Sequence, residues 1–306
     1  MPAPLRTMNA SLRALFDGII DYAGLFAPAS LDMTASVNNY ARYLNHPQRW
    51  ALGRFVLPVA RLDEFMNARE HPASEPWHLS GIISANIVSD LAAVDEFNCK
   101  APRAVMDSVE VRACNLDEID LIRLHQPPDT TVLYEIAPER AEEFLPILHS
   151  IGGCAKLRTG GVVAEAFPPV ESVAEFIARC AELAVPFKAT AGLHHPLRSV
   201  RPLTYEPDAP QAWMHGFLNL FAAAAIAWCA AGAGAAVPRP ALATCLADPE
   251  RANWHFDEDA LLWTGDEEPV RIDLNALRST RSRLALSFGS CSFEEPIRDL
   301  CEFDLL

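Results

Sequence analysis

Short apolar runs recur along the chain and alternate with segments of helical pattern. The runs that predict β-strands lie at 18–24, 54–60, 77–84, 103–111 and 130–137, at the two ends of 153–193, and at 284–290. Segments with apolar positions every three to four residues predict helices at 11–16, 32–44, 62–70, 88–97, 115–124, 138–151 and 169–183. No hairpin turn joins one run to the next, so the strands are expected to be parallel. The count and spacing favour a (β/α)8 TIM barrel of the α/β class, with an open doubly wound sheet as the alternative.

Residues 1–306 are expected to form a single barrel domain, with 196–283 as an enlarged, mostly helical and loop insertion between strands seven and eight. Within it the pattern predicts a proline-rich loop at 196–212, an irregular polar stretch at 248–268, and helices at 239–246 and 272–283. Residues 216–237 carry no charge and are long enough to span a membrane. They are rich in alanine and lack flanking basic residues, which favours a helix buried within the protein or at a subunit interface.

Composition narrows the possible partners. Half of the residues are apolar, and the net charge is −15. An acidic chain without a basic patch argues against nucleic-acid or anionic-membrane partners. The eight cysteines form no C-x-x-C pair and no signal peptide is evident, which predicts reduced thiols in a cytoplasmic protein. The expected partner is an anionic small-molecule substrate, and a homo-oligomer remains open.

Two lysines stand out because the chain contains only three, and Lys156 and Lys188 both lie inside apolar strand-like runs. A desolvated lysine can lose its proton, whereas an arginine cannot. Two lysines close together repel each other and an apolar wall disfavours their charge, so we expect lowered pKa values and a nucleophilic amine. The alternative is a non-catalytic barrel in which Lys156 pairs with Glu135 and Lys188 with Asp21.

Active sites of such barrels lie at the carboxyl ends of the strands, and many polar residues fall there. The candidate catalytic residues are Lys156, Lys188, Asp21, Asp107 and Glu135. The candidate substrate-binding residues are Arg158, Thr159, Gly160, Thr190, Gly192, His194, His195, Gly289, Ser290 and Ser292. The G-S-C-S turn at 289–292 suits an anion, because glycine admits close approach to backbone N–H groups. The same four residues are equally compatible with an ordinary turn that caps the last helix.

A metal-dependent enzyme is a second hypothesis. His194, His195 and His215 could bind a divalent cation together with Asp107 or Glu135. Adjacent histidines on a strand point to opposite sides, however, and no H-x-H or H-E-x-x-H spacing is present. The sequence therefore predicts neither a bound metal nor an organic cofactor.

Several short segments resemble deoxyribose-phosphate aldolases, in the same order along the chain. I-I-D-Y-A-G-L-F-A-P resembles their first strand, I-D-H-T-x-L-x-P, and V-L-Y-E resembles V-I-x-E-T. A-K-L-R-T-G-G, F-K-A-T-A-G-L and S-F-G-S-C-S are similar to K-T-S-T-G, V-K-A-S-G-G-I and R-I-G-T-S-S. The resemblance implies a class I aldolase barrel in which Lys156 forms the Schiff base and Lys188 tunes it. It also implies acids at Asp21 and Asp107, and a phosphate site at Gly192, Gly289 and Ser290.

The chain also departs from that family. Arg158 replaces a small hydroxyl residue, a histidine pair follows strand seven, and the 196–283 segment is far longer. We therefore expect a divergent lyase-type, Schiff-base enzyme acting on a small carbonyl or a phosphorylated or carboxylated sugar-like substrate.

Overall fold

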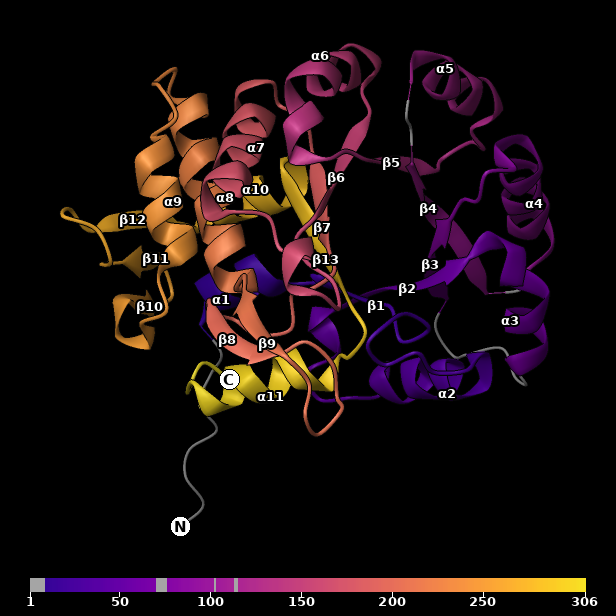
Figure 1. Ribbon diagram of the computed structural model, residues 1–306, viewed down its shortest axis with the longest axis horizontal. Helices are drawn as coiled ribbons and strands as arrows, with labels where there is room; N and C mark the ends of the chain where they lie inside the picture. Colours follow the sequence, from indigo (N-terminus) through magenta and orange to yellow (C-terminus); the bar gives the residue numbers. More distant parts are fainter. Residues whose placement is uncertain (1–8, 70–75, 102, 113–114) are drawn as a thin grey trace.

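The computed structural model describes all residues except 1–8, 70–75, 102 and 113–114. Eight parallel strands close into a barrel in the order β1-β13-β7-β6-β5-β4-β3-β2 (Figure 1). They are β1 (Ile20–Tyr22), β2 (Leu52–Pro58), β3 (Trp77–Ile82), β4 (Ala104–Arg112), β5 (Thr131–Glu135), β6 (Cys154–Arg158), β7 (Phe187–Thr190) and β13 (Ala285–Ser290). The (β/α)8 barrel predicted from the sequence is confirmed, because β1 pairs in parallel with both β13 and β2 and leaves no open edge.

Helices connect the strands and form the outer layer. They are α2 (Met33–Tyr43), α3 (Leu62–Ala68), α4 (Ile87–Lys100), α5 (Leu116–His125), α6 (Ala141–Ile151), α7 (Val170–Glu182), α8 (Phe217–Gly232) and α11 (Glu294–Glu302), with α1 (Ala10–Phe16) before the first strand. Short 3-10 turns lie at η1 (Arg49–Ala51), η2 (Val59–Arg61), η3 (Pro138–Arg140), η4 (Ala164–Ala166) and η5 (Arg251–Asn253). Side-chain caps fix several starts: Asp32 accepts from the backbone N–H of Ala35, and Asn115 accepts from that of Glu118.

The long connection between β7 and β13 contains more strand than its sequence pattern predicts. The expected loop at 196–212 contains a two-stranded hairpin, β8 (Ser199–Pro202) with β9 (Gln211–Met214). The expected irregular stretch contains most of a three-stranded antiparallel sheet, β10 (Trp254–Phe256), β11 (Ala260–Trp263) and β12 (Val270–Asp273). Strands of three or four residues are too short to show an alternating pattern. Tertiary packing stabilises them instead: Trp254 and Trp263 are fully buried and stack with centroids 5.9 Å apart.

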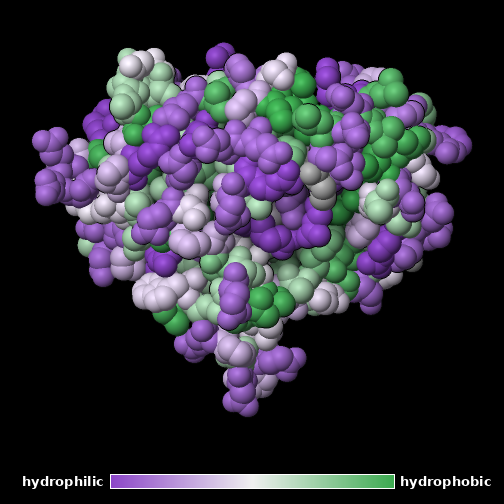
Figure 2. Space-filling view, turned by 45° about the horizontal axis from the view of Figure 1, so that its top comes forward, coloured by the Kyte–Doolittle hydropathy of each residue, from purple (hydrophilic) through white to green (hydrophobic). Residues whose placement is uncertain are grey.

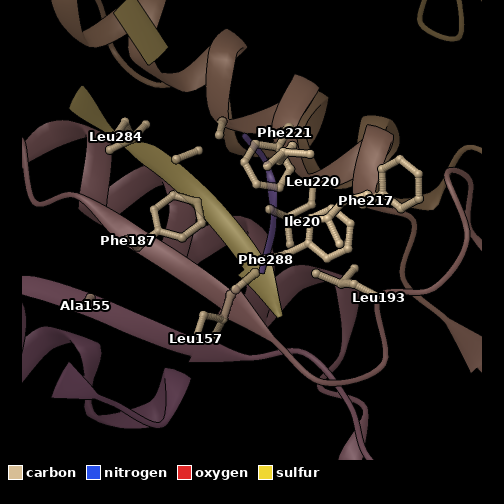
Figure 3. Packing of buried hydrophobic residues seen from close by; sticks show 14 of the residues in the cluster. Ile20, Ala155, Leu157, Phe187, Leu193, Phe217, Leu220, Phe221, Leu284 and Phe288 are labelled. Atoms are coloured by element: carbon tan, nitrogen blue, oxygen red, sulfur yellow. The ribbon is translucent and has the colours of Figure 1, made fainter. Parts of the chain in front are cut away.

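The alanine-rich segment is a buried helix of the insertion. Residues 217–227 of α8 are all buried, and the helix lies between α7, α9 (Arg239–Ala247), α10 (Leu274–Arg283) and β13. Figure 3 shows Phe217 and Phe221 of this helix facing Phe288 of β13, and the rings of Phe217 and Phe288 stack at 5.0 Å. The small alanines permit this close packing within the chain itself. Among the described residues, no helix is long and apolar enough to cross a membrane.

The face drawn in Figure 2 is mostly hydrophilic, with local apolar areas. Figure 2 shows hydrophilic residues across the middle of one face and apolar ones at its upper right, on the side where Figure 1 draws α4 and α5. Val88, Leu121 and Leu124 of these two helices are exposed. All described cysteines are free thiols, and Cys114 lies outside the described residues.

Candidate active site

Charged residues fill the centre of the barrel, where bulky apolar side chains usually pack. Lys188 Nζ lies 2.6 Å from Asp21 Oδ2 and 2.6 Å from Glu110 Oε1. Lys156 Nζ lies 2.9 Å from Glu110 Oε2 and 2.8 Å from Glu135 Oε2. These five residues form one continuous alternation of carboxylates and amines, here called the charge chain, from Asp21 through Lys188, Glu110 and Lys156 to Glu135.

The register of the strands brings the residues of the charge chain together. Lys156 of β6 is the direct partner of Lys188 on β7, and Glu135 of β5 is the partner of Lys156 on the other side. Residues directly opposite on neighbouring strands point to the same face of a sheet. Both lysine amines therefore enter the barrel side by side, as their positions in the two apolar runs predicted.

Hydrogen bonds from neighbouring strands hold the carboxylates. Asp21 accepts from the Ser287 hydroxyl at 2.8 Å and from the backbone N–H of Arg54 at 2.8 Å. Gly53 makes room for this carboxylate, since a Cβ there would lie 2.4 Å from Asp21 Oδ1. The Ser80 hydroxyl donates to Glu110 at 2.8 Å. Three other strand positions thus anchor the charge chain by hydrogen bonds.

The electrostatics differ from the sequence expectation for Lys188. Burial disfavours its charged form, but attraction to Asp21 and Glu110 outweighs burial and raises the pKa of Lys188 above its usual value. Burial likewise opposes ionisation of Glu110, yet attraction to Lys156 and Lys188 prevails and lowers its pKa. The expected lowering of the Lys188 pKa by repulsion from Lys156 is wrong, because Glu110 sits between the two amines and neutralises that repulsion.

A cavity of about 710 Å³ opens above the charge chain at the carboxyl ends of the strands. Its floor includes Lys156 and Lys188, and Phe26, Ile82 and Val162 contribute to an apolar wall. Lys188 is only 1% exposed, whereas Lys156 is 6% exposed. Lys156 is therefore the amine that a small molecule entering the cavity would meet first.

The predicted binding residues divide into two sets. Arg158, Thr190, Gly192, His194 and Gly289 line the main cavity. The others support the surrounding loops or lie beside the cavity: Thr159, Gly160, His195, Ser290 and Ser292. Gly192 has a left-handed backbone with φ 73°, a conformation that favours glycine.

Each residue of the second set has a structural partner. The Thr159 hydroxyl donates to the backbone oxygen of Ala191 at 2.6 Å and ties the loop after β6 to the end of β7. Gly160 lies against the Phe167 ring, which a Cβ would approach to 2.4 Å. Ser292 Oγ accepts from the backbone N–H of Glu295, and Ser290 Oγ accepts from that of Ser292. The G-S-C-S turn thus caps the start of α11, while Gly289 and Cys291 face the cavity.

Asp107 does not join the charge chain. Its carboxylate binds Arg54 Nε at 2.6 Å and His78 Nδ1 at 2.9 Å, away from the residues that line the cavity. The cause is a register shift: Met106 pairs with Leu79 but Ser108 pairs with Ser80, which leaves Asp107 as the extra residue of a bulge. Glu110 supplies the acid of β4 instead.

Sequence reasoning missed Glu110, although a signal for it was present. It lies between Val109 and Val111 near the carboxyl end of an apolar strand, and it shares a face with Ser108. Arg112 and Glu295 were also missed. Arg112 ends β4 at the cavity mouth, and Glu295 of α11 lies 3.1 Å from His194 Nδ1.

The histidines have separate partners. His194 pairs with Glu295, and His195 Nδ1 lies 2.5 Å from Asp299 Oδ2. The ring of His215 bonds the backbone oxygen of Pro168, and burial is the main cause that lowers the pKa of His215 to about 4. Within the part of the chain that the structure describes, no three His, Cys, Asp or Glu side chains are grouped so that they could hold a metal ion.

Neither a protein-family model, nor a curated protein, nor a solved structure matches this chain. The resemblance to deoxyribose-phosphate aldolases therefore stays a prediction, and any assignment of function depends on the site itself.

Proposed function

We propose that the protein is a lyase-type, aldolase-like enzyme in which Lys156 captures a small carbonyl substrate as a Schiff base. One observation carries the proposal. The Lys156 amine lies at the base of a cavity at the carboxyl end of the barrel, within 2.9 Å of two carboxylates that can take up its protons. A lysine with a purely structural role would not need such a cavity above it.

Schiff-base formation needs only groups that the charge chain contains. Glu135 or Glu110 accepts a proton from the Lys156 ammonium, and the nitrogen lone pair then bonds to the carbonyl carbon. The oxygen takes up protons and leaves as water, while the nitrogen lone pair forms the C=N bond. In sum, an ammonium and a carbonyl give an iminium and water, and both protons of that water come from the amine.

The iminium then acts as an electron sink. In a substrate with a hydroxyl on the second carbon from the iminium carbon, Glu135 removes the hydroxyl proton. The electron pair of the C–C bond moves into the iminium to form an enamine, and a carbonyl fragment leaves. Protonation of the enamine carbon and hydrolysis of the iminium return Lys156 as an ammonium.

Lys188 has a different role in this proposal. It is buried, and two carboxylates hold its positive charge. A fixed ammonium behind Glu110 stabilises that carboxylate while the proton and charge on Lys156 change. The same ion pairs also fit the non-catalytic alternative, so the two functions must be separated by reactivity.

Reductive trapping distinguishes the Schiff-base enzyme from the non-catalytic barrel. The protein is incubated with a panel of aldehydes, ketones and sugar phosphates, reduced with borohydride and mapped by mass spectrometry. We expect an adduct on the peptide that contains Lys156. The exposed Lys100 serves as an internal control for non-specific modification, because the chain has only these two lysines and Lys188. Absence of a Lys156 adduct across the panel, or equal labelling of Lys100, would refute the proposal.

A further inference from the structure

Two arginines stand at the mouth of the cavity, on either side of Glu135. Arg112, Glu135 and Arg158 are the last residues of the neighbouring strands β4, β5 and β6. Glu135 Oε1 lies 3.3 Å from Arg112 Nε and 3.5 Å from Arg158 Nε, and its second oxygen binds Lys156. One carboxylate is therefore shared by three cations.

The contacts of these arginines differ from those of arginines with a structural role. Arg239 holds both oxygens of Glu182 at 2.8 and 2.9 Å, a two-point pairing typical of a fixed ion pair. Arg112 and Arg158 instead make long contacts to a single oxygen, and their side chains are 75% and 46% exposed. Their guanidinium groups retain donors that can reach a second anion.

The surroundings leave room for that anion. Arg112, Glu135 and Arg158 line the main cavity and also a second, outer cavity of about 440 Å³. They form the partition between the two. An anionic group placed there is reached by both guanidinium groups, and the rest of its molecule can extend along the apolar wall of the main cavity.

We propose that Arg112 and Arg158 bind the carboxylate of a 2-oxo acid whose neighbouring carbonyl carbon reacts with Lys156. This inference rests on the proposed function and specifies its substrate class. Glu135 shows that a carboxylate at this position reaches Lys156 Nζ and both arginines at once. In the imine of a 2-oxo acid, bonds of roughly 1.3 and 1.5 Å join the lysine nitrogen to the carboxylate carbon. One carboxylate oxygen consequently lies about as close to that nitrogen as Glu135 does now.

The positive charge at the mouth of the main cavity allows Glu135 and the carboxylate of the substrate to be bound there together. With Arg112 and Arg158 added to the charge chain, four cationic groups face three carboxylates, which leaves one positive charge for the carboxylate of the substrate. The iminium preserves that charge. A carbonyl substrate whose anionic group is a distant phosphate would not use this position next to Lys156.

The test compares substrates that differ in one charge. Trapping on Lys156 is measured against concentration for pyruvate, for its neutral methyl ester and for acetaldehyde. We expect half-saturation by pyruvate at a concentration at least about ten-fold lower than by the ester, equivalent to ~1.4 kcal/mol. Arg158→Gln and Arg112→Gln should each remove most of this preference, measured as the ratio of the half-saturating concentrations of the ester and of pyruvate. Arg140→Gln is the matched control, because Arg140 lines the outer cavity and pairs with Glu143 at 3.0 Å.

The outcomes separate the two proposals. Trapping of acetaldehyde on Lys156 without a preference for pyruvate, or a preference that survives both arginine variants, would overturn the 2-oxo acid and leave the Schiff-base enzyme standing. No Lys156 adduct from any of the three compounds would overturn both.

Discussion

Replacement of Glu110 by glutamine probes the link that joins the two halves of the charge chain. Glu110 is 2% exposed and binds Lys156, Lys188 and the Ser80 hydroxyl. Glutamine keeps the volume but removes the charge that both ammonium groups share. Breaking a buried ion pair by removal of one partner costs about 3–5 kcal/mol. Because Asp21 and Glu135 remain to pair the lysines, we expect a loss of ~3 kcal/mol in the free energy of unfolding.

Urea unfolding followed by tryptophan fluorescence measures this loss. Asp107→Asn is the matched control on the same strand, and its partly exposed ion pair should contribute only about 1 kcal/mol. Lys188→Met should cost less in the Glu110→Gln protein than in the wild type, because the two residues interact directly. A Glu110→Gln protein as stable as the wild type, or strictly additive losses in the double variant, would refute the charge chain as described.

Further predictions concern pH and packing. Glu110 and Glu135 have pKa values below the ordinary 4.5 in the folded protein, so their stabilisation is complete above that pH and is lost as the pH falls below it. The free energy of unfolding should therefore decrease on acidification below about pH 4.5, and less steeply in Glu110→Gln; equal slopes would contradict this. The pKa of Lys188 is raised instead, so its stabilisation is complete below the ordinary 10.5 and should be lost only at still higher pH, which Lys188→Met should abolish. Gly53→Ala should destabilise the protein by about 1–3 kcal/mol through a clash with Asp21, and thermal unfolding unchanged from the wild type would exclude that contact.

The barrel could be predicted from sequence because its evidence is local. Each strand is an apolar run, each connection is long enough for a crossover, and the alternation of strand side chains places Lys156 and Lys188 with the inward set. These properties can be read without knowledge of distant contacts. The sequence was therefore sufficient to predict the fold class and the inward position of the two lysines.

The rest depends on contacts that the sequence pattern does not contain. A bulge beside Leu79 removes Asp107 from the inward face and brings Glu110 there. The sequence shows both acids within the apolar run, but the one-residue shift that decides which of them points inward leaves no mark on composition. The pKa of Lys188 follows from carboxylates on two other strands. The sheet of β10, β11 and β12 depends on the stacking of Trp254 on Trp263, residues that are neighbours only after folding.

Deuterium exchange tests the central claim, the Schiff base at Lys156, most directly. An iminium that forms an enamine exchanges the hydrogens on the carbon next to the carbonyl with solvent, without any reducing agent. In D2O, NMR should show that the protein accelerates deuterium incorporation into the methyl group of pyruvate or acetaldehyde. Under the Schiff-base mechanism, Lys156→Met should abolish the acceleration and Asp107→Asn should retain it. Exchange that continues undiminished in Lys156→Met, or no acceleration by the wild-type protein, would contradict it.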